Sequence, residues 1–145
     1  MSTKEIQEKI VANMQRWQAI EDTASVQMSE IIAKSKNPVI RQIMEIIRID
    51  SQNHYRVQKL IADSLTTETV TLSPDELHEI WDLIEKHQKT EKRAEEYAQD
   101  SLNAIQGKKM VIQEYLLKYL LEDEAKHDRL LDNLEAIKKG VYSVS

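Results

Sequence analysis

The sequence predicts an all-α fold, a four-helix bundle made of two related helical hairpins. Its 145 residues include only two glycines and two prolines, so the turns must be few and the helices long. Leu, Ile, Glu, Lys, Gln and Ala, which favour helix, dominate the composition. Apolar residues recur three and four positions apart along four segments. We expect one domain over residues 1–140 and a frayed tail at 141–145.

The first two helices are predicted from their capping residues. Ser2 and Glu5 fit a capping box. Asn37-Pro38 ends the first helix and opens a second, which we expect over about 38–64. The apolar stripe of the first helix comprises Ile6, Ile10, Met14, Trp17, Ala24, Met28 and Ile31. The stripe of the second comprises Ile40, Ile43, Ile47, Asp50, His54, Val57 and Ile61, two of which are ionisable.

The last two helices follow a connection rich in Thr and Val over residues 66–72. Ser73-Pro74-Asp75-Glu76 opens the third helix with a second capping box. Gly107 breaks the helical pattern, and Gly140 fits the end of a fourth helix. The third stripe includes His87 and Glu91 among Leu77, Ile80, Ile84, Ala94, Ala98, Ser101 and Ile105. The fourth includes Asp123, Glu124 and His127 among Leu116, Leu120, Leu130, Leu131, Leu134 and Ile137.

Composition excludes several classes of function. No cysteine is present, which excludes thiolate zinc or iron sites, iron–sulfur clusters and disulfides. The polar first residues lack a signal-peptide core, and no apolar run approaches the ~20 residues of a membrane span. The net charge of −5 without a basic cluster disfavours nucleic-acid binding. We therefore expect a cytoplasmic protein that binds neither membrane nor nucleic acid.

The ionisable residues of the stripes are expected at one depth. Glu21 lies 16 residues before Asn37 and His54 lies 17 after it. Around Gly107, Glu91 and Glu124 are placed in the same way. Since each helical residue adds about 1.5 Å of rise, these positions face each other across an antiparallel hairpin. Charged groups in a bundle core are costly unless they are paired or bind a cation.

The two halves of the chain also show internal sequence similarity. Glu21-x-x-Ala24 matches Glu91-x-x-Ala94. Ile49-Asp50-Ser51-x-x-His54 matches Glu122-Asp123-Glu124-x-x-His127. Glu124 and His127 share one helix face and can bind one ion together. Carboxylate and imidazole ligands suit iron or manganese, and zinc can also enter such a site. Two such helices, with one Glu from each of two others, make a dinuclear site.

At these residues the chain resembles the ferritin-like superfamily, specifically rubrerythrin-like di-iron carboxylate proteins, over about residues 3–139. The resemblance implies a pair of iron or manganese ions and an oxidase, peroxidase or ferroxidase activity on oxygen or peroxide. It implies an external electron donor and a homodimer as one assembly. The implied metal ligands are Glu21, His54, Glu91, Glu124 and His127. By the same resemblance, Asp123 orients His54, and Asp50 is either a ligand or the group that orients His127.

One residue departs from the family pattern, because Ser51 stands where the second helix should carry a glutamate. Asp50 or His87 can take its place, and His87 is otherwise a satisfied or partly exposed histidine beside Glu91. The site can also hold one ion or none. The alternative function is therefore a non-catalytic helical bundle with a degenerate metal site that binds a partner, and a weaker third option is an iron-storage shell subunit.

The path of the chain between the hairpins stays open. Residues 66–73 reach about 27 Å when extended. A helix of some thirty residues is about 45 Å long. Either the second helix stops early or the bundle runs simply up and down.

Overall fold

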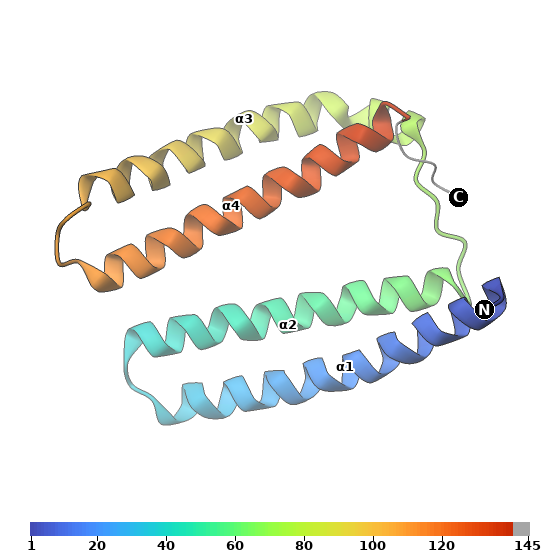
Figure 1. Ribbon diagram of the computed structural model, residues 1–145, viewed down its shortest axis with the longest axis horizontal. Coiled ribbons are helices and arrows are strands. Elements are labelled where there is room, and N and C mark those ends of the chain that lie inside the picture. The colour runs from blue at the N-terminus through green and yellow to red at the C-terminus, as the bar shows by residue number, and fades with distance from the viewer. Residues whose placement is uncertain (141–145) are drawn as a thin grey trace. The chain divides into compact units, whose positions relative to one another are not determined.

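The computed structural model describes residues 1–140, which form four α-helices and no strand (Figure 1). The helices are α1 (Thr3–Lys34), α2 (Pro38–Ser64), α3 (Pro74–Ala104) and α4 (Val111–Lys138). The predicted all-α, four-helix architecture is confirmed. Among these described helices, none is long and apolar enough to cross a membrane. The predicted frayed tail at 141–145 lies outside the described residues.

The helices pack in two pairs. α1 runs along α2 in a first unit, Met1–Val70, and α3 runs along α4 in a second unit that begins at Thr71 (Figure 1). We call these units hairpin 1 and hairpin 2. The prediction of two helical hairpins is therefore confirmed. The closure of both into one bundle domain over 1–140 stays a prediction.

Local hydrogen bonds set the helix ends where the sequence predicts them. The Ser2 hydroxyl accepts from the Glu5 N–H at 3.2 Å, and the Glu5 carboxylate accepts from the Ser2 N–H at 2.9 Å, which completes the capping box. Asn37 Oδ1 accepts from the first turn of α2 at 2.9 and 3.2 Å. The Ser73 hydroxyl accepts from the Glu76 N–H at 3.2 Å, but the Glu76 carboxylate accepts no return bond from the Ser73 N–H, so the second predicted capping box is only half formed. Each cap satisfies a backbone donor that the helix itself leaves free.

The seam between α1 and α2 does not follow the predicted apolar stripe. The most buried α2 residues are Ser51, Gln58 and Ala62, which lie beside that stripe on the helix surface. Stripe members Ile47 and Val57 remain 41% and 55% exposed. The reason is geometric, because a single partner helix covers only one side of an apolar face broader than 100°.

The two tryptophans have different environments. Trp81 on α3 is buried, and the Lys138 ammonium of α4 lies 4.2 Å from its ring centroid. This cation–π contact ties the first turns of α3 to the last turn of α4. Trp17 on α1 is 47% exposed. Within its own hairpin, Trp81 is therefore packed, whereas Trp17 is about half-exposed.

Candidate metal centre

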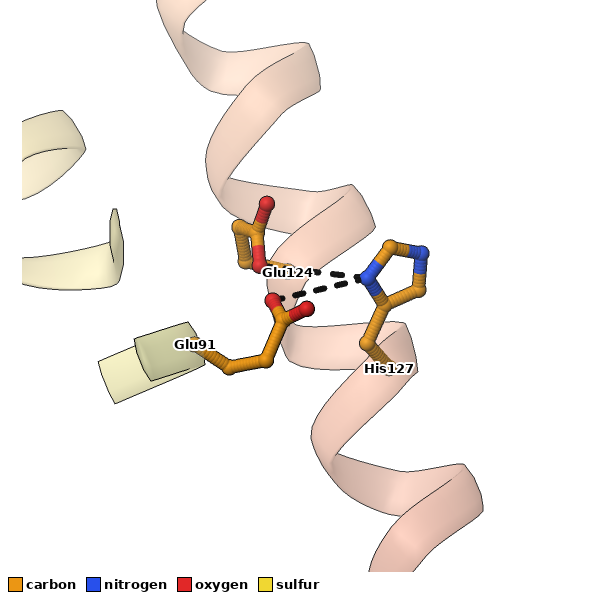
Figure 2. Close-up of side chains that lie close together, drawn as sticks. All are labelled: Glu91, Glu124 and His127. Carbon is orange, nitrogen blue, oxygen red and sulfur yellow. Dashed lines mark ion pairs between the residues drawn. The ribbon is translucent and has the colours of Figure 1, made fainter. Parts of the chain in front are cut away.

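Hairpin 2 brings three predicted ligands together (Figure 2). Glu91 extends from α3, and Glu124 and His127 extend from adjoining turns of α4. One ligand atom from each lies within 4.8 Å of the others. The sequence predicts this meeting, since the two α4 residues share a helix face and Glu91 lies at the matching depth. The three side chains form the group that we call the triad.

The distances within the triad leave room for an ion. His127 Nδ1 lies 3.5 Å from Glu91 Oε2 and 3.8 Å from Glu124 Oε2. Both separations are too long for a hydrogen bond. Ligands that each sit about 2.0–2.2 Å from one metal ion are themselves about 3–4 Å apart. Figure 2 shows both carboxylates approaching the same ring nitrogen. The geometry therefore suits a shared cation.

Two further side chains contact the triad. His87 Nε2 lies 2.7 Å from Oε1 of Glu91, the oxygen that does not approach His127. Asp123 Oδ2 lies 3.4 Å from Nε2 of His127. A carboxylate on one imidazole nitrogen fixes the ring and leaves the other nitrogen for a metal. Asp123 thus contacts the histidine of its own helix. Its predicted role toward His54, in the other hairpin, stays a prediction.

Among residues 1–140, two buried carboxylate oxygens accept no hydrogen bond. They are Oε2 of Glu124 in hairpin 2 and Oε2 of Glu21 in hairpin 1. A buried charged oxygen without a partner is costly, so both positions favour a nearby positive charge. A metal ion or a protonated imidazole can supply that charge.

More acidic groups lie close to the triad than the sequence indicated. A hydrogen bond with Asp128 raises the pKa of Glu95, and burial together with the charges of Asp128 and Glu91 adds to the rise. A run of charged residues such as 91–96 usually lies on a solvated helix face, and Glu95 departs from that rule. The available signal was spacing, because Glu95 lies one helical turn after Glu91 and can share its side of α3.

Hairpin 1 contains a smaller version of the same arrangement. His54 Nδ1 on α2 lies 3.4 Å from Glu21 Oε2 on α1, which nearly repeats the pair of His127 and Glu91. The Glu21 side chain is 9% exposed and that of His54 is 60% exposed. Ser51, at the position that matches Glu124, is buried and supplies no carboxylate. Asp50 is half-buried on α2, and its role as ligand or support stays a prediction.

Each hairpin therefore unites the predicted ligands that belong to it, two in the first and three in the second. The convergence of all five stays a prediction. Comparison with known proteins gives no further indication of the function, because no family model, no curated protein and no solved structure matches the chain.

Proposed function

We propose that the chain is a metal-binding protein whose first ion is bound by the triad. The observation that carries this proposal is the gathering of Glu91, Glu124 and His127 ligand atoms within 4.8 Å around a buried Glu124 oxygen that accepts no hydrogen bond. Two carboxylates and one imidazole are typical ligands of iron and manganese, and they also accept zinc. His87 and Asp123 support the site by positioning Glu91 and His127.

The proposal extends to a ferritin-like di-iron or di-manganese protein with oxidase, peroxidase or ferroxidase activity. Glu21 and His54 are then the ligands of a second ion, with Asp50 as a further ligand or support. Bound metal would supply the electron exchange with oxygen or peroxide. The protein would hold the ions, keep His127 in one tautomer through Asp123, and receive electrons from an outside donor, since it has no cysteine for an iron–thiolate centre.

A second candidate function is that of a non-catalytic bundle that binds a partner. Ser51 favours it, because hairpin 1 lacks the carboxylate that hairpin 2 has. Without metal, the pair of Glu21 and His54 and the pair of Glu91 and His127 can close as ion pairs with protonated histidines. Because the His54 and His127 side chains are 60% and 39% exposed, removing one member should cost less than the roughly 3–5 kcal/mol of a fully buried pair.

Thermal unfolding separates the two candidates. A metal that binds only the folded chain stabilises it by about 2.7 kcal/mol at a hundredfold excess over Kd. Metal binding by the triad predicts that added Fe²⁺ or Mn²⁺ raises Tm, that a chelator reverses the rise, and that Glu124→Gln reduces it. If neither added metal nor chelator changes Tm, only the partner-binding candidate remains.

Redox activity needs its own experiment. We expect protein loaded with Fe²⁺ under anaerobic conditions to consume oxygen or peroxide when either is added, and to form ferric iron faster than Fe²⁺ in buffer. The matched control is the Glu124→Gln variant at equal total iron. Loaded protein that oxidises iron no faster than buffer would retain the metal-binding proposal and reject the redox one.

A further inference from the structure

The two hairpins share one carboxylate–imidazole pair but differ in the residue that should complete it. The pair of Glu21 and His54 is 3.4 Å apart, and the pair of Glu91 and His127 is 3.5 Å apart, through the same atom types. Beside the second pair stands Glu124. Beside the first stands Ser51, which is 7% exposed and so occupies an interior position.

The surroundings of Glu21 favour a cation rather than a closed ion pair. Glu21 is 7% exposed, and its Oε2 accepts no hydrogen bond even though His54 lies nearby. A pocket of about 280 Å³ opens beside it, and its lining combines Ser51, Ser25 and Tyr55 with one further carboxylate, Asp22, and one cationic side chain, Arg56. Because one water takes about 30 Å³, this volume holds an ion together with several waters. Ser51, whose side chain is shorter than that of a glutamate, lines this space.

We infer that the two hairpins bind divalent cations unequally, and that the pair of Glu21 and His54 is a second, weaker site completed by water in the Ser51 pocket. This inference rests on the proposed function of the triad. Loss of a group that merely supports a metal ligand weakens binding roughly 10–100-fold. A missing direct carboxylate ligand should matter at least as much, so the second Kd should exceed the first by about tenfold or more.

The test is equilibrium dialysis of the full chain against Co²⁺, with elemental analysis of the bound metal. We expect two ions per chain in two affinity classes at least tenfold apart. His54→Ala should remove the weaker class and leave the tighter one. His78→Ala, on an exposed position of α3, is the matched control and should change neither class.

A gain-of-ligand variant tests the cause of the inequality. Ser51→Glu gives hairpin 1 the same Asp-Glu-x-x-His sequence as hairpin 2, and it should strengthen the weaker class at least tenfold. Ser51→Gln has a similar size without the charge and should not. Circular dichroism checks that both variants stay helical, and the His54→Ala result decides the matter if Ser51→Glu does not fold.

The outcomes separate this inference from the proposed function. Three results would overturn the inference. The wild-type chain could bind a single ion whose affinity His54→Ala does not change. It could bind two ions of equal affinity, or His54→Ala could remove the more tightly bound ion. A folded Ser51→Glu variant whose weaker class is unchanged would also overturn it. Absence of any bound Co²⁺ in the wild-type chain would instead overturn the proposed function.

Discussion

His127 Nδ1 lies 3.5 Å from Glu91 Oε2 and joins the middle of α4 to the middle of α3. Asp123 Oδ2 lies 3.4 Å from the other nitrogen of the ring, and His87 Nε2 lies 2.7 Å from the other oxygen of Glu91. Each partner thus has a further contact on the side away from the other. Such support is typical of side chains that must hold a metal ion in a fixed geometry.

His87 should strengthen metal binding without being a ligand. Because its imidazole holds Glu91 at 2.7 Å, His87→Ala should let that carboxylate move and should raise the Kd for Co²⁺ by roughly 10–100-fold. Equilibrium dialysis measures the change. His78→Ala on the same helix is the control, and an equal effect from both substitutions would rule out a specific role for His87.

Asp123 should act on the same ion through His127. Asp123→Asn keeps the shape of the side chain but removes the charge that favours a proton on Nε2, so metal affinity should fall by about tenfold or more. Asp132→Asn, an exposed acid further along α4, controls for the general loss of negative charge. Unchanged affinity in Asp123→Asn would mean that the 3.4 Å contact does not orient the ring.

The ionisation of Glu95 should lower the free energy of unfolding of the metal-free protein as pH rises. Its pKa is raised in the folded state above the usual 4.5, first through the hydrogen bond with Asp128. A raised folded pKa contributes stability that is fully present below 4.5 and is lost as pH rises through the folded pKa. Glu95→Gln cannot lose a proton, so it should be more stable than wild type near neutral pH, by on the order of 0.5 kcal/mol. The gain should vanish in acid.

Urea unfolding with chelator present, repeated at several pH values, measures this difference. Glu96→Gln, an exposed neighbour, is the matched control. If Glu95→Gln stabilises the protein equally in acid and at neutral pH, the charge of Glu95 is not the cause of the stabilisation.

Asn37 should stabilise hairpin 1 through its cap on α2. The side chain accepts hydrogen bonds from Val39 and Ile40, so Asn37→Ala leaves both N–H groups without that partner. The expected loss is about 1 kcal/mol of unfolding free energy, measured by urea denaturation. Asn37→Asp retains a capping oxygen and should lose much less. Equal losses in the two variants would contradict the role of the cap.

The helix boundaries could be predicted because their signals are local. Ser2, Asn37 and Ser73 each bond to a backbone group two or three residues ahead, so the sequence alone fixes the partner. The pairing of Glu21 with His54 and of Glu91 with His127 was also predictable. Nearly equal distances along the chain from the turn of an antiparallel hairpin place such residues opposite each other.

The details of the site could not be predicted in the same way. The contact of Asp123 with His127, one turn along its own helix, was not indicated by the sequence, and its expected role toward His54 stays a prediction. That choice depends on side-chain rotamers, which spacing does not determine. The hydrogen bond between Glu95 and Asp128 was missed because a run of charges usually faces water. The neighbouring helix covers only one side of each apolar stripe. Which side it covers depends on how the helices pack and not on the spacing of the apolar residues.

The metal content of the chain tests the central claim most directly. Protein dialysed against Fe²⁺ or Mn²⁺ without oxygen, and then against metal-free buffer, is analysed for bound metal beside its Glu124→Ala, His127→Ala variant. We predict at least one ion per wild-type chain, and at least one fewer in the variant while its helical content is unchanged. Equal metal in the two proteins, or none in either, would contradict binding by the triad.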